Sequence, residues 1–498
     1  MTVLGIDLGT SQAKAMLCGA DGTVLGRGAA GYDISTPRQG WAETDTADWW
    51  RAVLTAVRAA LTPLDAATGT ADGPVAGPVA EVAVIAVTGQ MHGVVLVSAQ
   101  SVVLRPAITW LDRRATAQAA DYRRLGARSL AALGNAPAPG MAGPLLSWLA
   151  RHEPAVYDAA RWQFQPKDWL RFALTGEAAT DPTDASGTLL FDLSGGIWAK
   201  DVVHGIGLRS DLLPPLGQPD EVAGLLLPGA AAELGLRPGI PVVTGASDTA
   251  AALLAARLPA PAAGSAAGSA AGQPAGQVTA QAAGSAAQLS AGPRWALLTL
   301  GTGGQWIMPA GAGAGADPAG RTSLFRAADG GLFRLGGAQN VGVTLNWVRG
   351  VLGVSWDDLY GSAASAAPSG SLVFWPELVT ERADQASSGG NWSGGNWSGG
   401  GWSGARLADG RQDLMRAALA GVAGLLRQRL EDLHAVGCVP EKVLLGGGGS
   451  RHPAWRDLLS SELGLPLCPA ATPWLTARGA TMLAGRAAGY DWAGAGND

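Results

Sequence analysis

Apolar runs that end in glycine-rich turns mark the predicted strands of this chain. Residues 3–8 run into Gly9-Thr10-Ser11, and residues 296–300 run into Gly301-Thr302-Gly303-Gly304. A short apolar run bounded by turn residues is typical of a buried strand. Because the same pattern occurs twice, far apart in the chain, we expect a duplicated fold with two related hairpins.

The remaining apolar and polar positions predict alternating strands and helices. Leu414, Ala418, Val422 and Leu425 recur at helical spacing, which predicts a long amphipathic helix over residues 411–433. Asp48 is the predicted N-cap of an earlier helix with Trp49, Val53, Val57 and Leu61 on one face. Further strands are expected at 24–25, 82–87, 94–97, 241–243 and 442–445, and further helices at 108–114, 140–153, 165–175, from 250, at 455–463 and at 472–488.

The length of 498 residues and the position of the second hairpin predict two large domains, at 1–246 and 247–490. Residues 259–293 hold almost no charged or large apolar side chains, so we expect a flexible insertion there. Residues 387–405 carry the repeat Asn-Trp-Ser-Gly-Gly, altered in its third copy at 401–404. Two interpretations of this second insertion stay open: a mobile stacking surface of tryptophans, or a repeat expansion in a surface loop.

Composition narrows the classes of partner. The net charge of −5 comes without a basic cluster, so nucleic acid is not expected as a partner. Three widely spaced cysteines give neither a disulfide framework nor a zinc motif and favour a reducing cytoplasm. The N-terminus lacks the pattern of a signal peptide, and no apolar run is long enough to cross a bilayer, so we expect a cytoplasmic protein without membrane contact.

The residues of the first hairpin suit phosphate chemistry. Gly9 permits close backbone approach, and Thr10 and Ser11 offer hydroxyl and amide donors. Lys14 adds a positive charge, and Asp7 is the predicted ligand of Mg²⁺, which takes only one or two carboxylates. The stretch is not a Walker P-loop, and on its own a plain hairpin with a surface aspartate is an equal alternative.

The order of five motifs resembles the FGGY carbohydrate kinases. They are Gly-Ile-Asp-Leu-Gly-Thr-Ser at 5–11, Trp-Ala-Glu-x-Asp at 41–45, Gly-Gln-Met-His-Gly at 89–93, Trp-Leu-Asp-x-Arg at 110–114 and Pro-Lys-Asp-Trp-Leu at 166–170. The third motif is similar to the xylulokinase branch. The resemblance implies an α/β fold of two RNase H-like domains, of the actin and hexokinase type, with a catalytic cleft between them.

Site residues follow from this resemblance position by position. Asp248 matches the catalytic aspartate, which would accept the proton of a sugar hydroxyl. The expected sugar contacts are Met91, His92, Trp110, Asp112, Asp248 and Thr249. The expected nucleotide contacts are Thr10, Ser11, Lys14, Gly301, Thr302, Gly337, Asn346, Gly448 and Gly449. For Asp112 and Arg113, an internal ion pair is the alternative to a sugar contact.

The implied activity is ATP- and Mg²⁺-dependent phosphorylation of a ketopentose, D-xylulose, to D-xylulose 5-phosphate, with a homodimer as the candidate assembly. Thr249 stands where the branch has asparagine, and residues 378–384 depart from the family's Gly-Glu-Arg-Thr-Pro segment. These departures keep two alternatives open: a kinase for another sugar, polyol or sugar acid, and a catalytically impaired relative that binds sugar or nucleotide.

Overall fold

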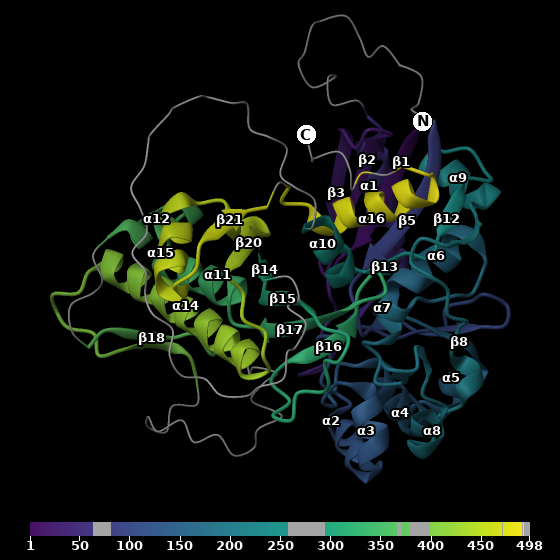
Figure 1. The fold of residues 1–498 in the computed structure, drawn as a ribbon, viewed down its shortest axis with the longest axis horizontal. Coiled ribbons are helices and arrows are strands. Elements are labelled where there is room, and N and C mark those ends of the chain that lie inside the picture. The colour runs from purple at the N-terminus through teal and green to yellow at the C-terminus, as the bar shows by residue number, and fades with distance from the viewer. Residues whose placement is uncertain are drawn as a thin grey trace, which may run out of the picture.

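Two β-sheets with helices packed against them form the framework of the chain (Figure 1). The structure is a computed structural model, which describes residues 1–62, 81–256, 294–365, 371–378, 399–470, 472–490 and 492. The predicted insertion at 259–293 and most of that at 387–405 lie outside the described residues, as do residues 379–384 of the divergent segment.

The first sheet contains the first predicted hairpin at its centre. Its order is β11 (Val222–Leu225), β12 (Pro241–Val243), β5 (Val82–Gly89), β1 (Thr2–Leu8), β2 (Gln12–Gly19) and β3 (Val24–Gly31), with β13 (Ala246–Ser247) paired to β5. Strand β1 is antiparallel to β2 and parallel to β5, so its carboxyl end lies beside that of β5.

The second sheet contains the second predicted hairpin in the same way. Its order is β16 (Ser323–Arg326), β17 (Leu332–Ala338), β15 (Gly304–Ala310), β14 (Trp295–Leu300), β20 (Lys442–Gly446) and β21 (Leu467–Pro469). Strand β14 is antiparallel to β15 and parallel to β20, which repeats the arrangement of β1 between β2 and β5. Both hairpins expected from the apolar runs are therefore present.

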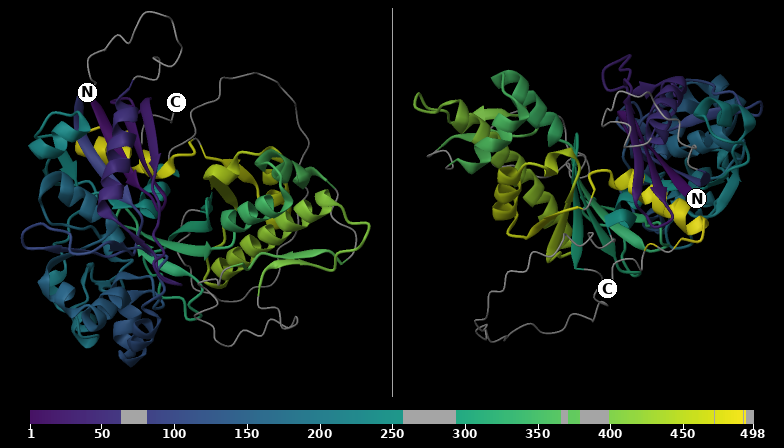
Figure 2. Two further views of the ribbon diagram at one scale, coloured as in Figure 1. Left: turned by 180° about the vertical axis from the view of Figure 1, so that it is seen from behind. Right: turned by 90° about the horizontal axis from the view of Figure 1, so that it is seen from above.

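Alternate residues of β1 face two different layers of helices. Leu4, Ile6 and Leu8 pack in one core with α1 (Thr46–Leu61), α6 (Pro166–Thr175) and α9 (Pro228–Leu234). Val3 packs in another core with α10 (Asp248–Ala256) and α16 (Leu475–Ala487). The second core also includes Leu297 and Phe333 of the second sheet, so α10 and α16 join the two halves (Figure 2).

Helix α16 comes from the end of the chain but lies against the first sheet. A Cβ atom on Gly5 of β1 would lie 2.7 Å from the carbonyl oxygen of Ala477, so only glycine allows this close approach. The same helix places Thr476 beside Asp7. The last helix of the chain therefore contributes directly to the predicted phosphate site, and the proposed domain boundary at 246 stays a prediction.

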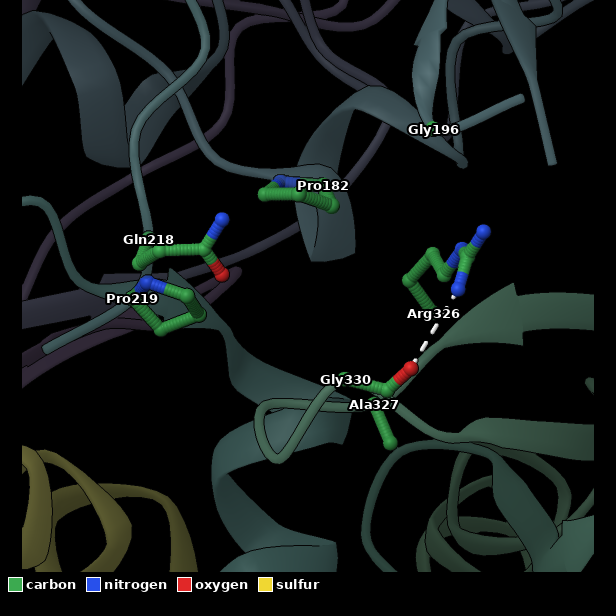
Figure 3. Close-up of a pocket in the computed structure, with 7 residues that line it drawn as sticks. All are labelled: Pro182, Gly196, Gln218, Pro219, Arg326, Ala327 and Gly330. Atoms are coloured by element: carbon green, nitrogen blue, oxygen red, sulfur yellow. Dashed lines mark hydrogen bonds between the residues drawn. The ribbon is translucent and has the colours of Figure 1, made fainter. Parts of the chain in front are cut away.

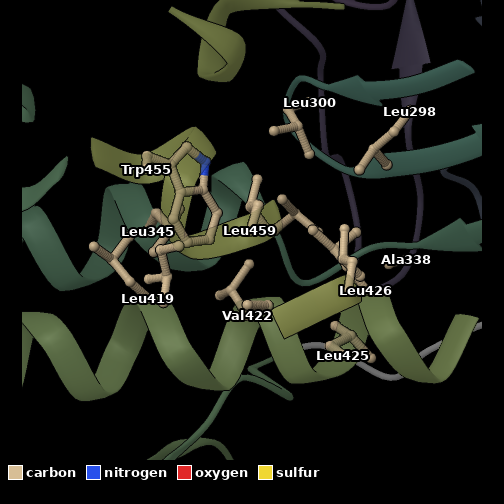
Figure 4. Close-up of a cluster of buried hydrophobic side chains, with 14 of the residues drawn as sticks. Leu298, Leu300, Ala338, Leu345, Leu419, Val422, Leu425, Leu426, Trp455 and Leu459 are labelled. Carbon is tan, nitrogen blue, oxygen red and sulfur yellow. The ribbon is translucent and has the colours of Figure 1, made fainter. Parts of the chain in front are cut away.

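The second half has its own core on the other face of its sheet (Figure 4). Helices α11 (Gly342–Leu352), α14 (Arg411–Ala435) and α15 (Pro453–Leu463) contribute buried Leu345, Val422 and Trp455. These side chains pack on Leu298 and Leu300 of β14. The apolar stripe predicted over 411–433 is therefore the face of α14 that covers the second sheet.

A smaller lobe extends the N-terminal half below the first sheet in Figure 1. Its core includes Leu145, Leu149 and Leu190. The lobe and its connections comprise β4 (Glu43–Thr44), β6 (Val95–Ser98), β7 (Ala107–Ile108), α2 (Thr116–Asp121), α3 (Ala127–Leu133), α4 (Ala142–His152), α5 (Pro154–Ala159), β8 (Ala160–Phe164), α7 (Pro182–Ala185), β9 (Phe191–Asp192), β10 (Ile197–Trp198) and α8 (Lys200–Gly205). The C-terminal half adds α12 (Trp356–Gly361), β18 (Val373–Trp375) and β19 (Gly401–Ser403).

Three local predictions were wrong. The N-cap of α1 is Asp45, whose side chain accepts from the amide of Ala47, while Asp48 lies in the first turn. The expected helix at 108–114 is a short strand and a turn, because Asp112 bonds to backbone instead of starting a helix. Helix α10 begins at Asp248, not at residue 250, so the carboxylate lies at the helix N-terminus.

The altered third copy of the tryptophan repeat is part of the packed structure. Residues Gly401–Ser403 form β19, which pairs with β18. The ring of Trp402 lies 5.0 Å from that of Phe374 and 5.7 Å from that of Trp347, and its Nε1 donates to the carbonyl of Leu414 at 2.8 Å. This copy is therefore a strand with a packed tryptophan, and the two interpretations of the whole insertion stay predictions because the first two copies lie outside the described residues.

Candidate active site

Asp7 is the next-to-last residue of β1, and only one of its two carboxylate oxygens has a partner among the described residues. Its Oδ2 accepts from Thr476 Oγ1 and lies 3.4 Å from Lys14 Nζ. Its Oδ1 is buried and has no hydrogen-bond partner among the described residues. Because buried carboxylate oxygens are normally satisfied, Oδ1 is suited to a cation. No group of three or more histidine, cysteine, aspartate or glutamate residues that could hold a metal ion is found in the described chain.

Asp248 lies at the start of α10, behind the carboxyl end of β13. Its Oδ1 accepts from the amide of Thr249 at 2.6 Å and from Thr249 Oγ1 at 3.1 Å. Burial, and next the charge of Asp7, raise the pKa of Asp248 to about 7, while Thr249 and Lys14 oppose this increase. A carboxylate with this pKa is suited to accept a proton near neutrality.

Met91 and His92, the two sugar contacts expected from the third motif, both lie against Gly187. A Cβ atom on Gly187 would lie 2.9 Å from Met91 Cε and 3.0 Å from His92 Nδ1. His92 Nδ1 lies 2.6 Å from the carbonyl oxygen of Gly187, and its ring is 5.9 Å from that of Phe325 in the second sheet. His92 adopts φ +74°, a left-handed conformation that is uncommon for a residue with a side chain. The strained backbone is held by Gln165, whose Oε1 accepts from the His92 amide at 2.6 Å.

The residues of the loop at 110–114 bond to different parts of the structure. Trp110 Nε1 donates to Thr10 Oγ1 at 2.9 Å, which ties this loop to the first hairpin. Asp112 is fully buried, and its two oxygens accept from the Ala42 amide and from the Arg114 side chain at 2.7–2.9 Å. Of the two alternatives for Asp112, the geometry favours an internal ion pair, with Arg114 in place of Arg113. Arg113 instead donates to Gln339 Oε1 of the second half at 3.0 Å.

A buried ionic cluster behind Asp248 was not anticipated as part of the site. Lys167 Nζ lies 2.6 Å from Asp168, 3.0 Å from Asp181 and 3.4 Å from Asp184, and all four side chains are fully buried. Burial alone would lower the pKa of Lys167, but the three carboxylates outweigh it and raise that pKa. Burial also raises the pKa of Asp184 well above its ordinary value. The rarity of lysine in the sequence was the signal that could have pointed to Lys167 and this cluster.

The cluster fixes the turn that presents Asp248. Lys167 Nζ donates to the carbonyl of Thr244 at 3.3 Å, and Thr183 Oγ1 accepts from the amide of Ser247 at 2.8 Å. Gly245 between them has φ +82°, and a Cβ atom there would lie 1.9 Å from the carbonyl oxygen of Val87. The turn before the predicted base is therefore held from both sides.

Four of the predicted nucleotide residues gather around the end of β14. The amide of Val343 at the start of α11 donates to the carbonyl of Thr302 at 2.8 Å, beside Gly301. Gly447 (φ +87°) turns β20 into Gly448–Ser450, and a Cβ atom on Gly449 would lie 3.0 Å from Leu300 Cβ. Two glycine turns and a helix N-terminus thus converge, an arrangement that suits phosphate.

Three more of the predicted nucleotide residues lie on β17, on α11 and in the turn of the first hairpin. Gly337 is in β17, opposite Gln305 of β15. Asn346 is exposed on α11, where its Oδ1 accepts from Arg349 at 3.1 Å. Ser11 is exposed at the turn of the first hairpin.

Two hollows in the described structure lie away from these residues. One, of about 170 Å³, is lined by Pro182, Gly196, Gln218, Pro219, Arg326, Ala327 and Gly330 (Figure 3). The other, of about 680 Å³, lies along residues 128–132 and 197–202. No predicted site residue lines either one, so neither is the predicted active site.

Comparison with known proteins decides the family. A sequence model for the N-terminal domain of the FGGY family of carbohydrate kinases matches residues 2–255, and the model for the C-terminal domain matches residues 296–488. The chain belongs to the FGGY family of carbohydrate kinases. An FGGY kinase transfers phosphate from ATP to a sugar or related alcohol, so ATP and a sugar-like molecule are its substrates.

Individual relatives are similar to this chain over nearly its full length. A xylulose kinase of Escherichia coli is 29% identical over 93% of this chain and 85% of its own, and one of Klebsiella pneumoniae is 30% identical with the same coverage. The solved structure of a xyloylose kinase from Brucella ovis has 29% identity and a TM-score of 0.78, covering 99% of this chain and 91% of its own.

The expected fold class is confirmed by this likeness. A glycerol kinase of Plasmodium falciparum with ADP, at 17% identity and a TM-score of 0.76, shares the fold. Among the described helices, none has the length and apolar character needed to cross a membrane.

Proposed function

We propose that this FGGY kinase phosphorylates a ketopentose, D-xylulose, at its terminal hydroxyl to give D-xylulose 5-phosphate, in the cytoplasm. The observation that carries the proposal is the meeting of Met91 and His92 at Gly187, on the wall that also receives Phe325 from the second sheet. Three relatives named xylulose kinases, from Escherichia coli, Klebsiella pneumoniae and Bacillus subtilis, match this chain over 85–88% of their own length.

In the proposed reaction, Asp248 is the general base. The hydroxyl oxygen of the sugar bonds to the γ-phosphorus of ATP, the bond from that phosphorus to the β,γ-bridging oxygen breaks, and the hydroxyl proton passes to Asp248. The products are the sugar phosphate, ADP and a protonated carboxyl. A pKa of about 7 matches this task, since catalysis by a base is most efficient when its pKa is near the working pH.

The other tasks are positioning and neutralisation of phosphate charge. Thr10 on one side, and Thr302, Gly448 and Gly449 on the other, supply backbone amides and hydroxyls. The amides of Gly9 and Gly301 donate to the carbonyls of Gln12 and Gly303 within their own turns, so these two glycines serve by allowing close approach of phosphate. Lys14 supplies a positive charge beside Asp7. Asp7 is the residue that would hold Mg²⁺ through Oδ1, which has no partner in the described chain, and a bound Mg²⁺ would offset the charge of the ATP phosphates.

A second candidate is a different sugar, polyol or sugar acid as the acceptor. Thr249 favours it, because its hydroxyl is already bonded to Asp248 and a threonine cannot offer the amide of the asparagine found in the branch. Thr249 is therefore the residue that argues most against D-xylulose as the acceptor.

An ADP-release assay over a panel of ketoses, polyols and sugar acids tests the proposal. We expect turnover with D-xylulose above all other acceptors, and none with Asp248→Ala, which keeps ATP binding by calorimetry. Faster turnover with another acceptor would show that D-xylulose is not the preferred substrate. Absence of turnover with every acceptor would favour the catalytically impaired relative.

A further inference from the structure

Gln90 has a buried side chain whose polar atoms bond to nothing in the described part of the chain. Its side chain is 1% exposed, and neither Oε1 nor Nε2 has a hydrogen-bond partner among the described residues. Leaving a buried amide unpaired is unfavourable, and most buried polar atoms in proteins have a hydrogen-bond partner. Two unsatisfied atoms on one side chain therefore indicate a partner from outside the protein.

The strand register places Gln90 between the end of β1, which carries Asp7, and Asp248. In parallel pairing, Thr88 of β5 lies opposite both Asp7 of β1 and Ala246 of β13. Two residues further along, Gln90 is level with Gly9 on one side and Asp248 on the other. The amide of Gln90 donates to the carbonyl of Leu8 at 2.9 Å, so this alignment continues past the end of β5.

The alternation of side chains along a strand puts these groups on one face of the sheet. Asp7 and Thr88 share that face, and Thr88 Oγ1, like Asp7 Oδ1, is buried without a hydrogen-bond partner in the described chain. Asp7 also acts on the charge of Asp248. Unsatisfied polar atoms thus converge at the carboxyl edge of three parallel strands, next to a phosphate-type turn.

We propose that Gln90 is a further catalytic residue, whose side-chain amide donates to an oxygen of the phosphoryl group as it moves from ATP to the sugar. The proposal rests on the proposed kinase function. The position between Gly9, where phosphate is expected, and Asp248, where the hydroxyl is expected, is where the transferring group must pass. The bonds formed and broken are those given above. Gln90 neither gains nor loses a proton, since a neutral amide stabilises charge only by donating a hydrogen bond.

Gln90→Leu removes the donor and keeps a similar volume. We expect kcat to fall about 10²–10³-fold, as when one donor to a transition-state charge is removed. The KM for sugar should change by less than about threefold, because the contact forms with the phosphoryl group and not with the sugar. Gln90→Glu, which keeps the shape and repels phosphate, should also lower kcat. The glutamate variant provides the test if the leucine variant does not fold.

Gln163→Leu is the matched control. Gln163 in β8 is also 1% exposed and its Nε2 also lacks a partner among the described residues, but it lies in the two-stranded β6–β8 sheet, opposite Leu96. Its replacement should leave kcat unchanged. Calorimetry with ADP, aluminium fluoride and sugar gives a second measurement: we expect the Gln90 variants to lose affinity for this phosphoryl mimic and to keep affinity for sugar alone.

Different results would overturn the proposed substrate and the proposed role of Gln90. Wild-type enzyme that phosphorylates no ketopentose overturns the substrate proposal, and any accepted alcohol, or the slow hydrolysis of ATP, then gives the kcat ratio for Gln90. A folded Gln90→Leu or Gln90→Glu with wild-type kcat overturns the role of Gln90. A variant that raises only the KM for sugar overturns it as well, because that result assigns Gln90 to the sugar.

Discussion

Replacing Asp248 by asparagine is expected to abolish phosphorylation and also to stabilise the folded protein at neutral and alkaline pH. Asparagine keeps an oxygen that can accept the two hydrogen bonds from Thr249, so the local geometry survives. It removes the charge that burial and Asp7 disfavour. Active sites often trade stability for function in this way.

The magnitude follows from proton linkage. The pKa of Asp248 is raised from an ordinary value of 3.8 to about 7, so the folded protein binds this proton more tightly than the unfolded chain. The stabilising contribution is therefore fully present below pH 3.8 and is lost as the pH rises through about 7. Because a tenfold difference in proton affinity corresponds to about 1.4 kcal/mol, the advantage of the asparagine variant should grow by about 1–3 kcal/mol between pH 5 and pH 8.

Urea unfolding without divalent cations, followed by fluorescence of the tryptophans, measures this difference across pH. The difference between variant and wild type isolates Asp248 from all other titrating groups. Asp201→Asn, which removes an exposed carboxylate in the first turn of α8, is the matched control and should show a flat difference. A flat difference for Asp248→Asn, or a variant less stable than wild type at pH 8, would refute the reasoning.

Three further predictions follow from the same geometry. Asp7→Asn should lower kcat by about 10²-fold and raise the Mg²⁺ concentration needed for half-maximal rate, read from ADP release against Mg²⁺; an unchanged Mg²⁺ dependence would contradict the metal role. Gly187→Ala should raise the KM for sugar about tenfold or more and leave that for ATP unchanged, because its methyl group would press on Met91 and His92; Gly229→Ala, with open space around it, is the control. Lys167→Met should destabilise the protein by about 3–5 kcal/mol in urea unfolding, since three buried carboxylates lose their cation, whereas exposed Lys442→Met should have little effect.

Local features of the fold could be predicted from the sequence because their signals are local. The strands β1 and β14 are apolar runs closed by glycine turns, and α14 carries its apolar stripe at helical spacing. The N-cap of α1 could not be chosen reliably, because both Asp45 and Asp48 precede apolar residues. The strand formed by 401–403 was missed because its glycine-rich repeat has low strand propensity, and the contacts of Trp402 with Phe374 and Trp347 outweigh it.

In the candidate site too, some residues could be predicted from the sequence and others could not. Asp248, Met91 and His92 could be placed through motif resemblance, and the structure puts Met91 and His92 against a common glycine. The partners of Asp112 and Lys167 could not, because ion pairs such as Lys167–Asp181 depend on tertiary packing that no spacing rule encodes. Likewise, Thr476 reaches Asp7 from the other end of the chain.

The central claim is that this enzyme moves the γ-phosphoryl group of ATP to a terminal sugar hydroxyl deprotonated by Asp248. A proton-coupled ³¹P spectrum of the reaction with D-xylulose tests it most directly. We predict a new phosphate ester signal split into a triplet by the two protons of a terminal carbon, formed by wild-type enzyme and absent with Asp248→Asn. A signal of equal intensity from the variant, or a phosphate on a carbon with one proton, would contradict the account.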